Sequence, residues 1–225
     1  MNDFQPVLDR ITSLAEHRKA PDDVLTAADD QREKRTARAS AMDRRYQGMT
    51  WDSLRASSEA ETKAHAMARE YAGLFAERKA DAWLILMGNR GTGKSLLCNL
   101  IAGDVASRGF QVMNRTAHEV YRDLKESREH TSESEFFRRM RGLDLLVISE
   151  LGFTNRSEDE RNFWRELTDM FYRDCVALVV ATNLPGKEAD GPSLGDYIDT
   201  DRASEMTRGH RYALRMEWES YRRPK

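Results

Sequence analysis

The chain has 225 residues, of which 40% are hydrophobic and 33% are charged, enough apolar material for one full domain with a small appendage. Its formal net charge of −2 excludes a polycation that binds nucleic acid through its overall charge. Any contact with nucleic acid therefore requires a local basic patch. Two distant cysteines, Cys98 and Cys175, exclude a disulfide framework, and no apolar run is long enough to span a bilayer, so we expect a cytoplasmic protein with two buried packing thiols.

The first 48 residues predict a small helical segment. Between residues 2 and 17, apolar side chains recur at spacings of three and four, which is typical of an amphipathic helix. Residues 27–47 predict a second helix, rich in Arg, Lys and Ala, that has too few large aliphatic side chains to bury much of itself. We therefore divide the chain into an N-terminal segment, residues 1–48, and a main domain, residues 49–225.

The main domain alternates helical and strand patterns. Helices are predicted over residues 59–79, 94–108, 116–128, 135–141 and 158–173, and strands over residues 82–87, 110–113, 143–149 and 176–182. Strands that alternate with helices imply crossover connections, and these make the strands of a sheet parallel. The predicted fold class is therefore α/β, with a parallel sheet flanked by helices and a small α-helical segment before it.

A phosphate-binding loop follows the first predicted strand. Residues 88–95 match the pattern G-x-x-x-x-G-K-[S/T] at every fixed position, between a predicted strand and a predicted helix. Glycines let the backbone turn its N–H groups toward phosphate, the Lys reaches the β- and γ-phosphates, and the Ser hydroxyl binds Mg²⁺. We expect ATP and Mg²⁺ as cofactors, with the metal on Ser95 and the nucleotide held by Gly88, Asn89, Arg90, Gly91, Thr92, Gly93, Lys94, Ser95 and Leu96.

The strand predicted over residues 143–149 ends in Ser149-Glu150. ATPases with this loop usually carry Asp followed by Glu here, where the Asp holds Mg²⁺ and the Glu activates the attacking water. Glu150 can serve as the general base, whereas Ser149 can offer only a hydroxyl to a metal-bound water. We therefore predict an ATPase with weak Mg²⁺ affinity and slow turnover; alternatively, Glu150 is only a surface charge at a strand end.

Several segments resemble DnaC-type bacterial and phage replicative helicase loaders, which are AAA+ ATPases related to the initiator DnaA. The resemblance covers residues 51–222 and is carried by residues 88–95, Leu145 to Gly152, Ala181-Thr182-Asn183 and the ending Trp218-Glu219-Ser220-Tyr221-Arg222. The phosphate loop is shared by many families, but the W-[D/E]-S-Y-R ending is much more particular. The resemblance implies a P-loop AAA+ core, and the short tail after Thr182 leaves room for only a minimal C-terminal lid.

The resemblance also implies roles for single residues beside Lys94 and Glu150. Asn183 is similar to the sensor that orients the attacking water, and Arg222 to a second sensor that contacts phosphate within the same chain. Arg202 resembles the arginine finger that reaches a neighbouring subunit's γ-phosphate, with Arg208 and Arg211 as alternatives. Each of the three could instead be an ordinary surface or strand-end residue.

The partners follow from the same resemblance. Residues 1–48 would bind a replicative DNA helicase hexamer, although the first helix could instead fold onto the core. The AAA+ domains would self-associate through their faces and contact single-stranded DNA, with Lys125 and Arg128 as the candidate cations. No membrane partner is expected.

Three other functions stay open. A transposition helper ATPase of the IstB type has the same core but serves a transposase on duplex DNA. A nucleotide-gated binding protein would hydrolyse little ATP, which Ser149 favours. A small-molecule kinase would need a lid and an acceptor pocket, and residues 184–210 offer no sign of either.

Overall fold

The computed structural model describes residues 27–77, 81–130, 132–153, 157–186 and 191–221. The chain forms two compact units, Met1–Glu33 and Lys34–Lys225. Of the first unit, only the start of helix α2 (Ala27–Ser40) belongs to the described residues, and the predicted helix over residues 2–17 lies outside them. The functional division at residue 48 stays a prediction.

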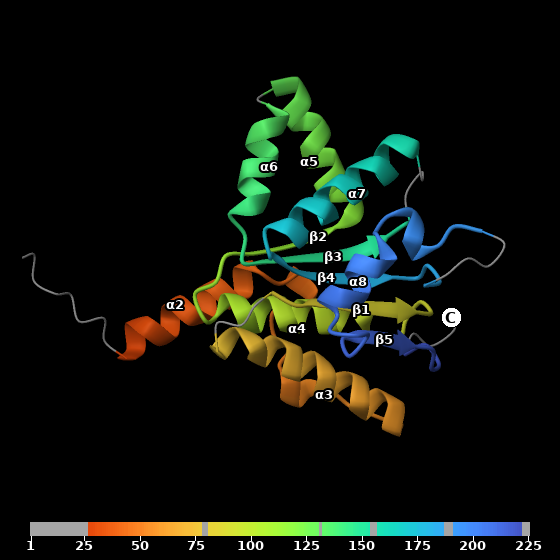
Figure 1. Ribbon diagram of the computed structural model, residues 1–225. Coiled ribbons are helices and arrows are strands. Elements are labelled where there is room, and N and C mark those ends of the chain that lie inside the picture. The colour runs from red at the N-terminus through yellow and green to blue at the C-terminus, as the bar shows by residue number, and fades with distance from the viewer. Residues whose placement is uncertain (1–26, 78–80, 131, 154–156, 187–190, 222–225) are drawn as a thin grey trace, which may run out of the picture. The chain divides into compact units, whose positions relative to one another are not determined.

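The second unit is built on a five-stranded sheet in the order β2-β3-β4-β1-β5 (Figure 1). Every neighbouring pair is parallel, which confirms the predicted fold class. The strands are β1 (Trp83–Gly88), β2 (Val112–Thr116), β3 (Leu145–Leu151), β4 (Ala177–Thr182) and β5 (Ala213–Met216). The sequence did not predict β5, because its four residues alternate too briefly to be told from a loop.

Helices flank the strands, and several of them begin at a side-chain cap. They are α3 (Glu59–Gly73), α4 (Lys94–Ala106), α5 (Ala117–His130), α6 (Glu133–Arg141), α7 (Glu158–Arg173) and α8 (Thr200–Met206). The hydroxyls of Ser58, Ser132 and Ser157 accept N–H bonds at the starts of α3, α6 and α7. Such caps typically stabilise a helix by about 1 kcal/mol each.

The sheet separates two apolar cores. Alternate residues of a strand point to opposite faces, so Trp83 and Ile85 of β1 belong to one core while Leu84 and Leu86 belong to the other. Figure 1 shows α5, α6 and α7 over the first face and α3 and α4 over the second. Burial on both faces is why the strands read as continuous apolar runs.

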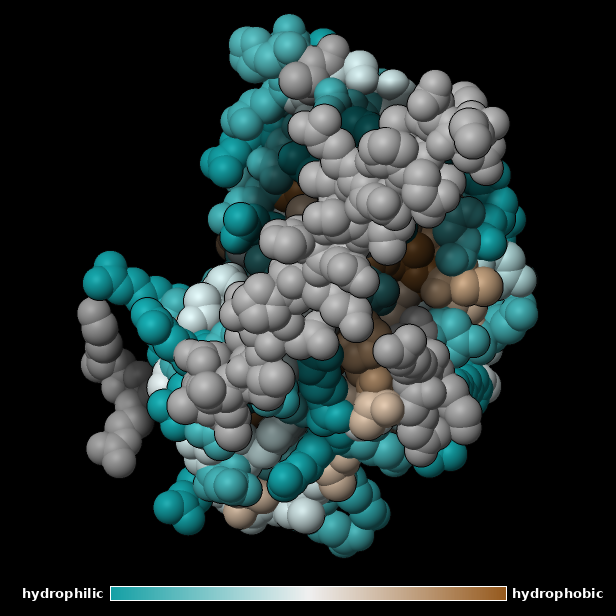
Figure 2. Space-filling view, turned by 90° about the vertical axis from the view of Figure 1, so that its left-hand side faces the viewer, coloured by the Kyte–Doolittle hydropathy of each residue, from teal (hydrophilic) through white to brown (hydrophobic). Residues whose placement is uncertain are grey.

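The surface reflects the charged composition. Figure 2 shows one face on which most of the described surface is hydrophilic, with smaller apolar patches between. No helix within the described ranges is long and apolar enough to cross a membrane. Cys98 is buried in α4, but the prediction that Cys175 is buried is wrong. Cys175 lies in the turn between α7 and β4, where its φ of 53° directs the chain into the next strand.

Candidate functional site

The phosphate loop joins the carboxyl end of β1 to the first turn of α4. Gly88, Gly91 and Gly93 have φ values of 134°, 83° and 94°, a region that L side chains rarely adopt. Within the part of the chain that the structure describes, the N–H groups of residues 90–96 have no acceptor. A row of unpaired N–H groups at a helix N-terminus is a site for an anion such as a polyphosphate.

The Lys94 ammonium lies inside the loop. Its Nζ donates to the carbonyl oxygens of Gly88 at 2.8 Å and Asn89 at 2.6 Å. Lys94 is buried, and this burial lowers the pKa of its ammonium. The lysine is therefore a desolvated cation held by neutral carbonyls, and phosphate oxygens would be stronger acceptors for it.

The segment after β5 closes on the outer side of the loop. The backbone N–H of Tyr221 donates to the Gly91 carbonyl at 3.0 Å. The indole Nε1 of Trp218 donates to the Thr92 carbonyl at 3.2 Å. Two residues of the W-E-S-Y-R ending thus hold the carbonyl side of the loop, which leaves the N–H side for a ligand. The sequence pointed to this ending only by resemblance and did not predict that it packs here.

Gly88 and Gly91 are needed both for their positive φ angles and because residues 216–220 lie directly against them. A Cβ on Gly91 would lie 1.9 Å from the hydroxyl oxygen of Ser220. A Cβ on Gly88 would lie 2.2 Å from the Met216 carbonyl oxygen, which itself accepts the Asn89 N–H at 3.2 Å. The loop therefore approaches Met216 and Ser220 too closely for a side chain at either glycine.

The end of β3 is irregular where the acidic residue lies. The register of β3 against β4 shifts between Ile148 and Leu151, and Glu150 has a φ of 63°. A non-glycine residue with positive φ costs of order 1–3 kcal/mol and is typical of functional sites. This irregularity turns the exposed Glu150 side chain out of the strand alternation, while Ser149 remains in register with Thr116 of β2. The sequence contains no signal for this backbone angle.

Asn183 follows β4 at the same edge of the sheet. The preceding Thr182 hydroxyl donates to the Leu151 carbonyl at 2.8 Å and accepts the Leu184 N–H at 3.0 Å, so it ties the ends of β3 and β4 together. Asn183 itself is exposed. Since β3, β4 and β1 are parallel neighbours, their carboxyl ends bring Ser149, Glu150, Asn183 and the phosphate loop to one edge.

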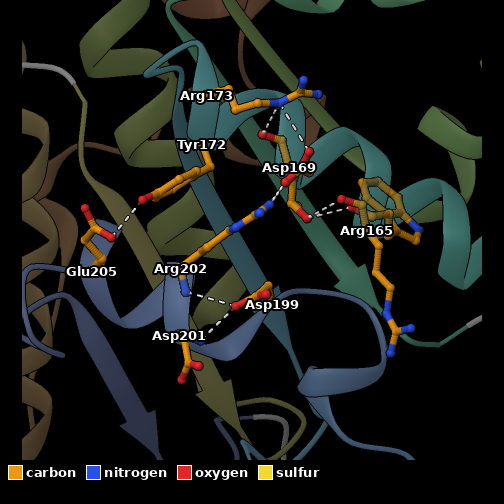
Figure 3. A network of polar contacts seen from close by, with 10 residues as sticks. Arg165, Asp169, Tyr172, Arg173, Asp199, Asp201, Arg202 and Glu205 are labelled. Carbon is orange, nitrogen blue, oxygen red and sulfur yellow. Dashed lines mark hydrogen bonds and ion pairs between the residues drawn. The ribbon is translucent and has the colours of Figure 1, made fainter.

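Arg202 is not part of that edge. Its guanidinium forms an ion pair with the Asp169 carboxylate of α7 and lies 5.1 Å from the centre of the Tyr172 ring (Figure 3). It lines a cavity of about 590 Å³ together with Trp83, the first residue of β1. The phosphate loop begins at the other end of β1, roughly 17 Å along the strand. The Arg202 side chain therefore lies away from its own phosphate loop.

The other predicted cations have partners or lie outside the described residues. Arg208 pairs with Asp81 at 3.4 Å, and Arg211 pairs with Glu70 at 2.5 Å. Arg222 lies outside the described residues. On α5, the Lys125 ammonium lies 4.4 Å from the Tyr121 ring centre, and Arg128 donates twice to Glu133 at 3.0 and 3.1 Å.

The site fits a nucleotide polyphosphate with a divalent cation. The unpaired N–H groups and the narrow glycine loop suit the phosphates. No group of three or more His, Cys, Asp or Glu side chains gathers in the described ranges of the chain. A metal here would be shared between phosphate oxygens and the side chains of Ser95 and Ser149, as is usual for Mg²⁺.

Two sequence comparisons agree with this geometry. The family described as IstB-like ATP binding protein matches residues 20–224. The replicative helicase loader DnaC of Escherichia coli (strain K12) is 27% identical over 191 residues, which cover 84% of this chain and 75% of DnaC.

Solved structures show the same fold. A crystal structure of the DnaC helicase loader superposes with a TM-score of 0.58 at 14% identity, covering 78% of this chain and 100% of that one. The replication initiator DnaA bound to AMPPCP and single-stranded DNA superposes with a TM-score of 0.63 at 17% identity over 79% of this chain. The match covers 51% of that DnaA chain, so this chain spans about half its length. The fold is the P-loop fold of AAA+ proteins.

Proposed function

We propose that this chain, which belongs to the family of IstB-like ATP binding proteins, is a helicase loader. It binds a replicative DNA helicase and loads it onto single-stranded DNA under the control of ATP. The match to the DnaC loader along most of the chain supports the loading role. The observation that carries the ATP-dependent part is the phosphate loop, because its N–H groups are unpaired and the segment after β5 covers its carbonyl side.

The residues at the edge of the sheet would divide the work of ATP hydrolysis. The loop N–H groups and Lys94 would hold the phosphates, with the ammonium exchanging two backbone carbonyls for phosphate oxygens. Bound Mg²⁺, held by Ser95 and more weakly by Ser149, would supply positive charge to the phosphates. Glu150 would take a proton from the attacking water, and Asn183 would orient that water. Arg222 would contact phosphate from the same chain.

Arg202 supports self-association through the AAA+ faces. A guanidinium paired with Asp169 on the surface can exchange that carboxylate for the phosphate of a nucleotide bound to a second copy. Its place beyond the far end of β1 suits an action between copies. An arginine supplied in this way typically raises phosphoryl-transfer rates by about 10³- to 10⁵-fold.

The remaining partners are assigned to two surfaces. Residues 1–48 would bind the helicase hexamer. Lys125 and Arg128 on α5 would contact single-stranded DNA, where phosphate oxygens would replace the Glu133 carboxylate at Arg128.

The loading role is tested by complex formation. The full chain is mixed with the replicative helicase of its source, with and without ATP and Mg²⁺, and the mass of the product is measured after size-exclusion chromatography. We expect a stable complex that is lost when residues 1–33 are deleted, a deletion that leaves the second compact unit whole, while the deleted chain still binds a fluorescent ATP analogue. The absence of a complex under every condition would overturn the proposal.

Failure of that test would favour a transposition helper, to which the family description also applies. The partner would then be a transposase on duplex DNA. Binding to duplex DNA that responds to ATP, without any helicase complex, would identify this alternative.

Turnover should be limited by the serine at position 149. Ser149→Asp restores a carboxylate next to the expected metal, and a hydrogen bond to a charged group contributes about 1.5–3 kcal/mol. We expect the Mg²⁺ concentration for half-maximal ATP hydrolysis to fall by about 10- to 100-fold, and turnover at limiting Mg²⁺ to rise. Ser149→Ala serves as the control and should not show this gain. Equal turnover of wild type and Ser149→Asp at limiting Mg²⁺ would contradict the prediction. If single-turnover experiments detect no hydrolysis even in Ser149→Asp, a nucleotide-gated binding protein is favoured.

A further inference from the structure

Asn99 is a buried amide in the middle of the apolar helix α4. Its side chain is 2% exposed. Its Nδ2 donates to the Ser95 carbonyl at 2.8 Å and to the Asp43 carboxylate at 3.3 Å. Its Oδ1 accepts the backbone N–H of Asp43 at 2.6 Å and the amide of Asn114 at 3.1 Å. These four bonds fill the hydrogen-bonding capacity of the amide.

A second asparagine holds the same stretch of backbone. Asn114 of β2 donates to the Ala41 carbonyl at 3.0 Å as well as to Asn99. Residues 41–43 are thus fixed on both sides of Met42, by Asn114 at Ala41 and by Asn99 at Asp43. We call residues 41–43 with Asn99 and Asn114 the latch.

Packing supports the latch. Met42 is 5% exposed and lies against Gly103 of α4, where an added Cβ would be 2.6 Å from the Met42 sulfur. A glycine inside a helix costs about 1 kcal/mol relative to alanine. Packing explains why a glycine occupies position 103, since it makes room for the Met42 side chain. The latch is a specific contact between α4 and the chain that follows α2.

The latch connects the chain that follows α2 with the first turns of α4. It begins directly after α2, and residues 1–48 form the segment that the proposed function assigns to the partner. At its other end it touches the carbonyl of Ser95, whose hydroxyl is the expected Mg²⁺ ligand. Because the amide of Asn99 is planar and all its bonds are used, it cannot follow a shift of Ser95 without weakening a bond to residues 41–43.

We propose that Asn99 is a positioning residue that couples Ser95 to residues 41–43, so that Mg²⁺–ATP binding and engagement of the N-terminal segment each change the affinity for the other. The identity of the partner rests on the proposed function, but the coupling does not. Such coupling must be reciprocal, because it is a free energy shared by two binding events.

Amide hydrogen exchange of the full chain, measured by mass spectrometry with and without Mg²⁺–ATP, tests the coupling without a partner. In the wild type we expect Mg²⁺–ATP to slow exchange over residues 88–96 and to change exchange over residues 41–49 by about fivefold or more, the low end of ordinary coupling between sites. Asn99→Ala should keep the first effect and lose the second. Asn162→Ala is the matched control, since Asn162 is exposed on α7, and it should retain both effects.

A double variant separates coupling from simple anchoring. Asn99→Asp combined with Asp43→Asn keeps a carboxylate–amide pair and an acceptor for the Asp43 N–H and for Asn114, but removes the donor to the Ser95 carbonyl. We expect normal exchange over residues 41–49 without nucleotide and no response to Mg²⁺–ATP. A wild-type response in this variant, or no response over residues 41–49 in the wild type, would overturn the inference. Loss of the helicase complex with this coupling intact would instead overturn only the loader proposal.

Discussion

Glu150→Gln is expected to lower the single-turnover rate of ATP hydrolysis by roughly 100- to 10,000-fold, the usual contribution of a general base. The amide has nearly the same size as the carboxylate but cannot accept a proton from water at neutral pH. The Glu150 side chain is exposed at the irregular end of β3, so the change removes no core packing. The affinity for ATP should stay within about threefold, because the phosphate contacts belong to the loop.

The matched control for this prediction is Glu59→Gln on the surface of α3. Glu59 pairs with Lys63 at 2.6 Å and lies in an exposed first helical turn. An exposed pair of this kind contributes at most about 0.5 kcal/mol, so hydrolysis should be unchanged. A Glu150→Gln variant that hydrolyses ATP as fast as wild type would mean that Glu150 is only a surface charge.

Lys94→Ala is expected to weaken ATP binding by about 10- to 100-fold, because a hydrogen bond to a charged group contributes about 1.5–3 kcal/mol. The ammonium is buried within the loop, where its charge is poorly screened. Isothermal titration with a slowly hydrolysed ATP analogue measures the loss. The weakening should be smaller for ADP, since the lysine also reaches the γ-phosphate.

Lys63→Ala provides the control for Lys94→Ala. It removes an exposed lysine from α3, where Lys63 pairs with the neighbouring Glu59. ATP affinity should not change in this variant. If Lys94→Ala binds ATP as tightly as Lys63→Ala does, the loop does not hold phosphate through its lysine. The thermal unfolding of both variants would exclude a general loss of structure.

The strand–loop–helix unit around Lys94 and the α/β class could be predicted from the amino-acid sequence. Both depend on local patterns: an apolar run, glycines at fixed spacing and a helix start, all within residues 82–108. The strands β3 and β4 were also predictable, because a parallel sheet buried on both faces requires continuous apolar runs. The chemistry of Ser149 and Glu150 followed from their place at the end of such a run.

The features that could not be predicted join residues that are far apart in the chain. Trp218 and Thr92 are separated by 126 positions, and Asp43 and Asn99 by 56. Strand β5 exists because β1 offers it a partner, and Arg202 lies beside Asp169 because α7 and α8 pack together. Propensity and periodicity describe a chain segment and its immediate neighbours, whereas these contacts depend on how the sheet brings distant segments together. The positive φ of Glu150 belongs with them, since the surrounding strands must stabilise a backbone angle that its own side chain disfavours.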